Sequence, residues 1–537
     1  MAENIKTIRI ESILGGHAPT THFARADQFR ASLGIDPAQP QDDSDSAVSS
    51  IASALIRPAS SQKFSGTVLN AAPLWMIPNP KDANIYVYDA LGSAYTIDAA
   101  FSALTALSDG GSLTNSLGNG AEYYDNYMYF GKATTVARYG PLNGAPAFDG
   151  DFWVTTLSKT ALSNNTYPST YKSGLLLPNH CLKRHSDGKL YLLDVNGNQG
   201  TVHYIRTTKS SVEGDTDNGS TYGALTLGYG LWPNALESYG SDLAIAVYEG
   251  SVANLRQARA KLAFWDTTST NFNKIIWVEF PDTIISALRN VGGVLYAVSG
   301  NINAQGFRIT RFIGGYSFEE VLYSETGEPC LPGAAEAILN QFLAGGFTTV
   351  PESGGHVLSV GLQKRALSRN AFSIMKATGG DSSTVVTAVL AADNNELGFA
   401  TPIIGWTKGS GTTNNGIDKQ GTQYNNAPSV FWSQMWRVGN TFRVKRIRIP
   451  FAQAMAANMT LDVKFYIDDG SASYTGSTYG LPTLDNSTLT SGQRFANLEV
   501  KGVEGVNNLF VEFRWTGSSL LTVSLPVIIE IEIVTET

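Results

Sequence analysis

The fold of this chain is decided by a short stretch, Asp187-Gly188-Lys189-Leu190-Tyr191, in which a tight polar turn leads directly into an apolar strand. Asp-Gly and Gly-Gly tolerate positive φ at both central turn positions, so such a pair before an apolar run predicts a hairpin. The same arrangement recurs, and we take its fifth residue as the anchor. The other instances are Asp82-Ala83-Asn84-Ile85-Tyr86, Asp125-Asn126-Tyr127-Met128-Tyr129, Gly240-Ser241-Asp242-Leu243-Ala244, Gly292-Gly293-Val294-Leu295-Tyr296 and Gly354-Gly355-His356-Val357-Leu358.

The repeating unit is about 40 to 50 residues long and holds several strands, as propeller blades do, although the anchors are spaced irregularly, by 43, 62, 53, 52 and 62 residues. Six anchors, with a weaker unit after Arg369, predict an all-β chain with a six- or seven-bladed β-propeller-like domain over residues 63–425. Because the spacing is irregular, a pair of packed β-sandwiches remains an alternative. Residues 334–344 predict a helix inserted between blades, since their apolar residues share one helical side.

Residues 426–537 predict a C-terminal antiparallel β-sandwich of jelly-roll type. Apolar and polar residues alternate at Leu461–Ile467 and Leu509–Trp515, as on half-buried strands. The apolar phase switches near Lys445-Arg446, which predicts a β-bulge. Residues 529–533 predict a last strand, and its glutamates disfavour pairing with strands of other molecules.

Residues 1–62 predict a short N-terminal arm. Ile8 and Ile10 alternate with polar residues as in a strand, and residues 27–33 read as two helical turns. Val48, Ile51 and Leu55 lie on one face of a further predicted helix. These segments are too small to form a core, so the arm either docks on another protein or packs on its own chain. The candidate assembly contacts are Ile8, Ile10, Val48, Ile51 and Leu55.

Composition excludes several classes of protein. Charged residues make up 16% of the chain and the net charge is −8, so the basic footprint of a nucleic-acid-binding protein is absent. Cys181 and Cys330 are too few for a disulfide framework; they are two buried thiols or one bridge. The sequence shows neither a signal peptide nor an apolar run long enough to span a membrane, which fits synthesis in a host cytoplasm.

No catalytic, cofactor or metal site is predicted. The histidines at 17, 22, 180, 185, 203 and 356 lack zinc-binding spacing, and the calcium-like loops 194–200 and 215–219 fit hairpin turns better. A propeller glycosidase would need two or three converging carboxylates. The carboxylates near predicted strand ends are Asp89, Asp149, Asp151, Asp187, Asp194 and Glu249. Acidic residues are so common at turns that we predict no enzyme activity from them.

Two further surfaces have alternative interpretations. Lys445, Arg446 and Arg448 form a basic stripe that fits a solvated strand face or a partner contact. Four aromatic residues of the C-terminal region are candidates for stacking on sugar rings, although core or rim positions are the commoner fate. They are Trp432, Trp436, Tyr474 and Tyr479.

Three stretches carry a resemblance to tailed-bacteriophage virion proteins: Ile10–Gly16, Asp27–Pro37 and Lys445–Pro450. Phage tail nozzles and hubs resemble this layout in using propeller-like domains arranged as a ring. The resemblance covers the two ends of the chain better than the middle, and it transfers no active-site residue. It implies a virion tail protein whose partners are copies of itself and other tail proteins.

Three classes of function follow as expectations. The first is a structural tail protein (nozzle, hub or ring) that assembles as a homo-oligomer within the virion. The alternative is a receptor-recognition protein of the tail that binds host surface glycan through the C-terminal sandwich. A propeller glycoside hydrolase is the third and least supported.

Overall fold

The computed structural model is all-β apart from short helical turns. It describes most of the chain. The described residues are 4–10, 16–17, 28–33, 35–37, 56–58, 60–66, 68–107, 120–159, 161–162, 180–206, 224–250, 258–269, 275–301, 306–314, 316–324, 327–338, 341–346, 356–361, 371–378, 383–394, 399–409, 412–424, 429–433, 436–450, 459–467, 472–474, 495–499, 506–517 and 529–535.

The chain divides into two compact units. The first unit comprises residues 1–62, 348–380 and 420–537, and the second comprises residues 63–347 and 381–419. Residues 348–380 lie inside the predicted propeller span, yet they cluster with the first unit. Among the described residues, no helix is long and apolar enough to cross a membrane.

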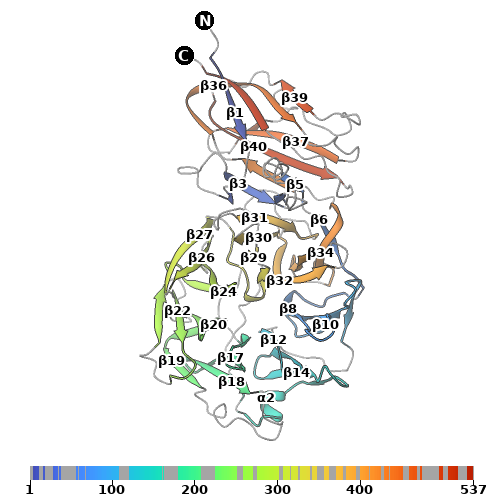
Figure 1. The fold of residues 1–537 in the computed structure, drawn as a ribbon, viewed down its shortest axis with the longest axis vertical. Helices are drawn as coiled ribbons and strands as arrows, with labels where there is room; N and C mark the ends of the chain where they lie inside the picture. Colours follow the sequence, from blue (N-terminus) through green and yellow to red (C-terminus); the bar gives the residue numbers. More distant parts are fainter. Residues whose placement is uncertain are drawn as a thin grey trace. The chain divides into compact units, whose positions relative to one another are not determined.

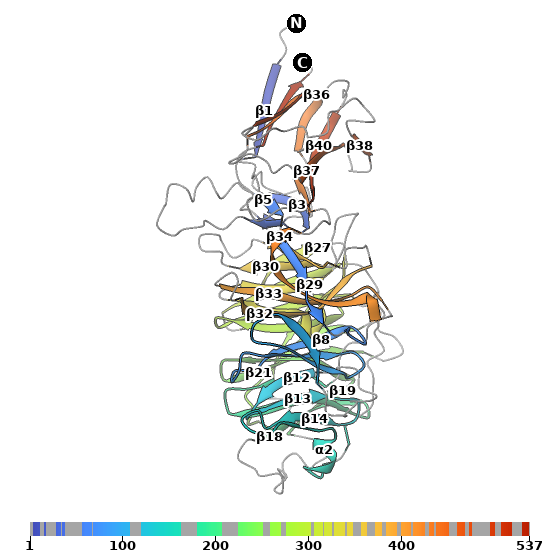
Figure 2. The same ribbon diagram turned by 90° about the vertical axis from the view of Figure 1, so that its right-hand side faces the viewer.

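The second unit begins with five complete sheets that follow one another along the sequence and surround a common centre (Figure 1). Turning the view by 90° shows the same ring of sheets from its side (Figure 2). In each sheet the strands pair antiparallel, except that β7 joins β11 in parallel. The strands of the first sheet are β7 (Ser65–Gly66), β8 (Pro73–Pro78), β9 (Ile85–Asp89), β10 (Ala94–Ile97) and β11 (Ala103–Ala106).

The next four sheets have four strands each. The second holds β12 (Gly120–Tyr124), β13 (Tyr127–Gly131), β14 (Val136–Gly140) and β15 (Ala147–Asp149), followed by helix α2 (Phe152–Thr155). The third holds β16 (Leu182–Arg184), β17 (Lys189–Asn196), β18 (Gln199–Arg206) and β19 (Leu225–Tyr229). The fourth holds β20 (Leu231–Tyr239), β21 (Asp242–Glu249), β22 (Arg259–Trp265) and β23 (Ile276–Glu279). The fifth holds β24 (Ile284–Val291), β25 (Val294–Gly300), β26 (Phe307–Gly314) and β27 (Ser317–Ser324).

Two more sheets begin in this unit. We call the strand of each sheet that lies nearest the centre of the ring its inner strand, and the described residues contain seven of them. The sixth starts with the 3₁₀ turn η4 (Pro332–Ala334), β28 (Ala335–Ile338) and β29 (Gln341–Gly346). The seventh holds β32 (Val385–Asn394), β33 (Phe399–Thr407), the turn η5 (Thr412–Asn414) and β34 (Asn415–Tyr424). Each inner strand contacts the inner strand of the next sheet, in the order β8, β12, β16, β20, β24, β28, β32 and back to β8. The second unit is therefore a β-propeller.

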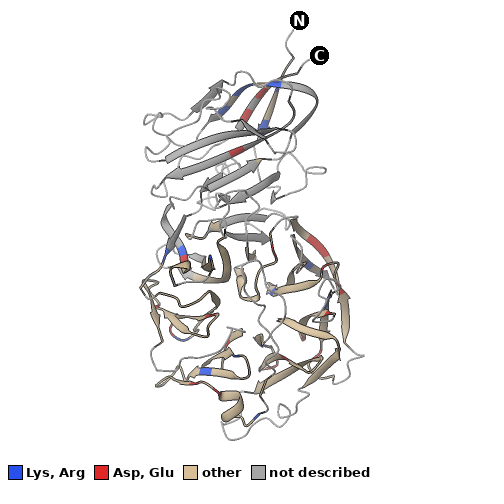
Figure 3. Ribbon diagram, turned by 180° about the vertical axis from the view of Figure 1, so that it is seen from behind, with Lys and Arg blue, Asp and Glu red and all other residues tan. Residues whose placement is uncertain are grey.

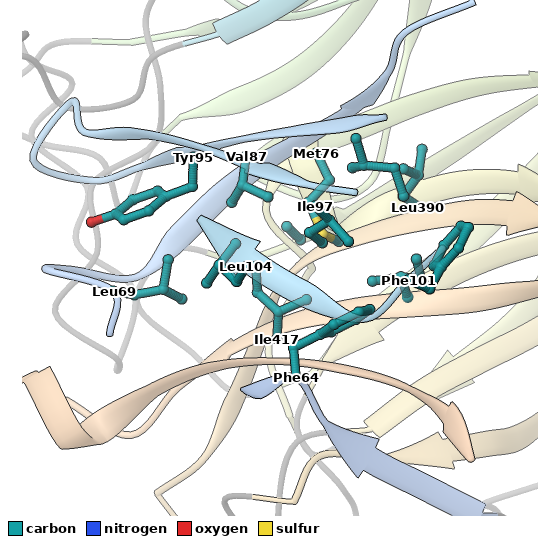
Figure 4. Packing of buried hydrophobic residues seen from close by; sticks show 13 residues of the cluster. Phe64, Leu69, Met76, Val87, Tyr95, Ile97, Phe101, Leu104, Leu390 and Ile417 are labelled. Atoms are coloured by element: carbon teal, nitrogen blue, oxygen red, sulfur yellow. The ribbon is translucent and has the colours of Figure 1, made fainter. Parts of the chain in front are cut away.

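One hydrophobic cluster closes the ring between the first and the seventh sheets (Figure 4). Met76, Val87 and Ile97 of the first sheet pack with Leu390 and Ile417 of the seventh. The buried hydroxyl of Thr387 on β32 also donates a hydrogen bond to the carbonyl oxygen of Pro73 on β8, at 2.6 Å. Residues far apart in the sequence thus complete a single core, and burial of apolar surface stabilises the closed ring.

The anchors test the predicted repeat directly. Tyr86, Tyr129, Tyr191, Ala244 and Tyr296 each lie in the strand that follows and pairs with the inner strand of their sheet, in β9, β13, β17, β21 and β25. The prediction of a shared turn-strand unit is confirmed for these five. Leu358 is the exception, because it lies in β30 (His356–Gly361) whereas β29 holds the second-strand position.

The first unit contains a ten-stranded sheet that joins the two ends of the chain. Strand β1 (Asn4–Ile10) pairs antiparallel with β41 (Ile529–Thr535), and β3 (Gln28–Leu33) with β35 (Ser429–Ser433). The predicted arm therefore contributes strands to a sheet of its own chain. The sheet's other strands are β2 (Gly16–His17), β36 (Trp436–Pro450), β37 (Met459–Ile467), β38 (Ala472–Tyr474), β39 (Phe495–Glu499) and β40 (Val506–Gly517). The remaining short strands are β4 (Ile35–Pro37), β5 (Ile56–Pro58), β6 (Ser60–Lys63), β30 and β31 (Ala371–Lys376).

Two helix predictions are wrong. Residues 28–33 form strand β3, and residues 335–338 and 341–346 form the hairpin of β28 and β29. Periodicity cannot separate a short apolar helix from a buried strand, and here pairing with a neighbouring strand decided the outcome. The helix predicted around Val48, Ile51 and Leu55 lies outside the described residues. The predicted bulge is confirmed, since the register of β36 with β41 shifts between Val444 and Arg446.

Candidate functional site

Five successive inner strands of the propeller carry a charged residue at the same register position. This position pairs with the anchor, or with its equivalent, on the second strand. The pairs are Glu122 with Tyr129, Lys183 with Tyr191, Glu237 with Ala244, Arg289 with Tyr296 and Glu336 with Leu343. The sign of the charge alternates from strand to strand, and we name these five residues the inner charge arc. In β8 the corresponding residue is Ile77, opposite Tyr86.

Glu237 lies between the two cations of the arc. Its Oε1 is 3.0 Å from the Lys183 Nζ, and its Oε2 is 3.6 Å from the Arg289 Nη1. The Arg289 guanidinium also donates hydrogen bonds to the carbonyl oxygens of Leu288, at 3.1 Å, and Pro332, at 3.4 Å. Because the Glu237 side chain is only 4% exposed, these contacts are weakly screened by solvent and link three neighbouring sheets.

The three glutamates share one local arrangement. In each, Oε1 accepts a hydrogen bond from the backbone N–H of the following residue: Tyr123 at 3.3 Å, Ser238 at 3.0 Å and Ala337 at 2.7 Å. The same bond at equivalent strand positions holds each carboxylate in a similar orientation. The arc is thus a repeated feature of the inner strands.

A cavity of about 30 Å³ lies next to this arc. The side chains that matter for its chemistry are Trp75, Glu122, Cys181, Lys183, Arg289 and Pro332, and apolar residues complete the lining. Apolar residues and three charged groups therefore line a space that accepts one or two water-sized molecules.

Burial shifts the titration of the groups around the cavity. It raises the pKa of Glu122, an effect that the nearby Lys183 only partly offsets. Burial by itself would lower the pKa of Lys183, but the carboxylates of Glu237 and Glu122 outweigh it and the pKa is raised. Burial also raises the pKa of Cys181 to about 12, so this thiol is protonated and poorly nucleophilic at neutral pH.

A second buried polar cluster lies between the second and third sheets. The His180 Nδ1 is 2.7 Å from the Lys132 carbonyl oxygen, and its Nε2 is 3.1 Å from the Asp194 Oδ1. His203 follows on β18, where the Thr201 hydroxyl is 3.2 Å from its Nε2 and Trp153 packs edge-on against its ring. Burial lowers the pKa of His203 to about 4, so the ring is neutral at physiological pH. Both His180 ring nitrogens have partners, which indicates a structural role.

The six candidate carboxylates are spread over several sheets, each in a contact of its own. Asp89 accepts from the backbone of Leu91 and Ser93, and burial raises its pKa. Asp187 stays in its turn, where burial would raise its pKa but the hydrogen bond from the Tyr191 hydroxyl, at 2.7 Å, and further donors lower it.

The other four are similarly engaged. Asp149 lies 3.6 Å from the Arg138 Nε, and Asp151 lies 3.5 Å from the Lys132 Nζ at the start of α2. Asp194 binds His180, and Glu249 lies 2.6 Å from the Lys261 Nζ. Residues 194–200 form the β17–β18 hairpin, as the turn interpretation predicted.

For the aromatic candidates, the structure gives only the strand in which each residue lies. Trp432 lies in β35, Trp436 begins β36 and Tyr474 ends β38, whereas Tyr479 lies outside the described residues. His17 lies in β2 and His356 in β30, while His185 is buried and hydrogen-bonded to Ser238. Within the part of the chain that the structure describes, no group of three or more His, Cys, Asp or Glu could hold a metal. Cys181 and Cys330 are separate buried thiols, so the disulfide alternative is wrong.

The inner charge arc was not identified from the sequence. Its members sit in short apolar strands, where a single charged residue looks like a solvent-facing position. The signal that would have found them is register: four arc residues lie opposite an anchor of the turn-strand unit, and Glu336 lies opposite Leu343, which holds the equivalent position. Charged residues are otherwise sparse and scattered over the propeller (Figure 3).

Comparisons with known proteins give only distant likenesses. No family model matches the chain, and no curated protein matches it. The RRP9 WD40 repeats share 9% identity, covering 68% of this chain and 99% of that one, with a TM-score of 0.41. The Neurospora crassa Pan2 WD40 domain shares 11%, covering 67% and 96%, with a TM-score of 0.39. The extracellular domain of the hybrid two-component system BT4673 from B. thetaiotaomicron shares 10%, with a TM-score of 0.36.

The last comparison covers 78% of this chain but only 47% of the BT4673 domain, so this chain spans about half the length of that protein. At such identities and scores, none of these proteins informs the function. The assignment of the second unit as a β-propeller rests on its own sheet order and on the closure of its ring between β32 and β8.

Proposed function

We propose that this chain is a structural component of a bacteriophage virion, a tail protein of nozzle, hub or ring type that assembles as a homo-oligomer. The virion part of the proposal rests on the resemblance at Ile10–Gly16, Asp27–Pro37 and Lys445–Pro450. The assembly part rests on one observation, the exposed edge strand β1.

Strand β1 stands at the end of the hydrogen-bonding order of its sheet, and among the described strands it pairs with β41 alone. Lys6, Thr7 and Arg9 are exposed, and Ile5 is 51% exposed. An edge strand leaves backbone N–H and C=O groups available for a strand of another chain. This arrangement supports contact between copies through the edge of the sheet.

The position of β1 changes which residues we expect at the contact between copies. Ile8 and Ile10 are paired with Ile531 and Ile529 of the same chain in the register of β1 with β41. In our proposal Ile5 and the open backbone edge of β1 provide the intermolecular contact. We further propose that the strands of residues 426–537 form a jelly-roll-like sandwich, and that other tail proteins are the remaining partners.

The assembly proposal is tested by mass photometry and negative-stain electron microscopy of the full-length chain. We expect a closed oligomer, and we expect Ile5→Lys to yield monomers because it places a charge at the contact edge. Leu91→Lys is the matched control, since Leu91 is 58% exposed in the propeller and should leave assembly unchanged. A chain that stays monomeric at high concentration, or an Ile5→Lys variant that assembles normally, contradicts the proposal. The virion part fails if purified tailed particles encoding this chain do not contain it.

A further inference from the structure

The edges of the ten-stranded sheet indicate which strand fits the open side of β1. Among the described strands, β1, β2, β38 and β39 each pair with a single neighbour. Strand β2 has two residues and β38 has three, whereas β39 has five and β1 has seven. A sheet that continues between molecules needs a ladder of backbone hydrogen bonds on both strands. The edge of this chain that best matches β1 in length is therefore β39.

The directions of the strands also match. Strands β1 and β39 bound a four-stranded part of the sheet, in the order β1, β41, β36 and β39. All three pairings are antiparallel, so β1 and β39 run in opposite directions. A second copy in the same orientation therefore brings its β39 antiparallel to the β1 edge of the first, and the alternation of direction continues from copy to copy.

Two rows of paired residues cross these four strands. They are Glu499, Arg446, Glu532 and Thr7 in one row, and Asn497, Arg448, Glu530 and Arg9 in the other. When Thr7 lies opposite Glu499 of the next copy, Arg9 lies opposite its Asn497. Each row then continues into the same row of that copy, without a shift along the strands. Such a contact adds no rise between copies, as a closed ring requires.

The charges of the two strands are opposite. The charged residues of β1 are Lys6 and Arg9, both basic and both exposed, whereas the charged residue of β39 is Glu499. The Arg9 Nε lies 3.1 Å from the Glu530 Oε1, yet the Arg9 side chain is still 58% exposed. In this register Glu499 of the next copy lies diagonally across from Arg9, where opposite charges stabilise a sheet. Two β1 edges would instead bring basic strands together.

The apolar residues agree with the same register. It places Ile8 opposite Leu498 and Ile10 opposite Ala496 of the next copy. A shift of one residue in either direction would place Ile8 opposite a polar residue, because side chains alternate between the faces of a sheet. The polar and apolar patterns of the two strands therefore select one parity of register.

We propose that the β1 edge of one copy binds strand β39 of the next copy, head to tail, so that the sheet continues around the ring. This inference rests on the proposed assembly through β1, and it adds the identity of the partner strand and its register. Heterologous contacts of this kind close into a ring when the rotation between copies permits it.

Disulfide trapping in the full-length chain tests the proposal. Thr7→Cys/Glu499→Cys is oxidised with copper phenanthroline and run on a non-reducing denaturing gel. Opposite residues of an antiparallel pair have Cα atoms about 4.5 to 5.5 Å apart, which suits a disulfide. Within one chain the two positions are three strand spacings apart, about 14 Å, which is too far. We therefore expect a ladder of covalent oligomers that extends beyond the dimer and is lost on reduction.

The controls separate this contact from others. Thr7→Cys alone and Glu499→Cys alone should give no covalent dimer, and neither should the unaltered chain, whose Cys181 and Cys330 are buried. Thr7→Cys/Ala496→Cys is the matched control, because in this register Ala496 belongs to the opposite face from Thr7 and should not cross-link. A covalent dimer of Thr7→Cys alone shows that two β1 edges pair, and it overturns the proposal. An assembled double variant without a ladder overturns it as well.

Hydrogen exchange of the unaltered chain gives an independent check if the cysteine variants fold poorly. Assembly should slow exchange in both residues 4–10 and residues 495–499, since each edge gains hydrogen bonds. Slowing in residues 4–10 alone contradicts the choice of β39. A chain that never assembles contradicts the proposed function itself, whereas an assembled chain without the ladder contradicts only the partner strand.

Discussion

Lys183 and Glu237, which lie on the inner strands of adjacent sheets, meet with the Nζ 3.0 Å from the Oε1, and the same carboxylate lies near Arg289 of the next sheet. One buried carboxylate thus joins three sheets of the propeller. Groups of this kind contribute little when compared with apolar replacements, but removing one partner leaves the others buried and unpaired.

Glu237→Gln should lower the free energy of unfolding by about 3 kcal/mol, because Lys183 and Arg289 then lose their shared counter-charge. Urea titration followed by tryptophan fluorescence measures this change. The control is Glu249→Gln, whose half-exposed ion pair with Lys261 should contribute less than about 1 kcal/mol. Equal stabilities of the two variants would show that the arc does not stabilise the ring.

Gly333→Ala should destabilise the propeller by about 2 kcal/mol or more, since a methyl group there would overlap the carbonyl oxygen of Leu74 on β8. Calorimetric Tm values compare it with Gly346→Ala, where nothing lies within 4 Å of the added atom. We expect the control to stay close to the unaltered chain. A Gly333→Ala variant as stable as the control would contradict the close packing of η4 against β8.

Thr387→Val should cost about 1 kcal/mol, because it removes the buried hydrogen bond to the Pro73 carbonyl oxygen at the junction of the first and seventh sheets. Thr155→Val is the control, since the Thr155 hydroxyl makes an exposed bond to the Asp151 carbonyl oxygen. Urea titration of both variants is the measurement. If the two lose the same stability, the junction bond is no more important than a surface one.

The lowered pKa of His203 predicts that the protein loses stability in acid. The folded pKa of about 4 lies below the ordinary value of 6.5, so the unfolded chain takes up a proton first as the pH falls. Stability from this group is complete above pH 6.5 and declines between 6.5 and 4, by about 3 kcal/mol. His203→Gln should flatten the decline in Tm over this window, and an unchanged pH profile would contradict the prediction.

The sequence by itself determined the local units of this protein. Turn pairs such as Asp187-Gly188 and Gly292-Gly293 tolerate positive φ, and the structure gives Gly188, Gly292 and Gly293 φ values of +80°, +58° and +88°. The alternation over residues 461–467 and the phase change near Lys445 predicted strand β37 and the bulge of β36. These features depend on neighbouring residues alone, which is why they can be read directly.

Only the tertiary structure decided which strands meet. Residues 335–346 have an apolar pattern that fits a helix, and antiparallel pairing made them a hairpin. The joining of β1 to β41, the packing of Met76 against Leu390 and the alternation of charge from Glu122 to Arg289 all involve residues in distant parts of the chain. Local propensity does not specify the partner of a strand edge or the neighbour of an inner strand. That choice follows from burying apolar surface and pairing charges once the ring of sheets has closed.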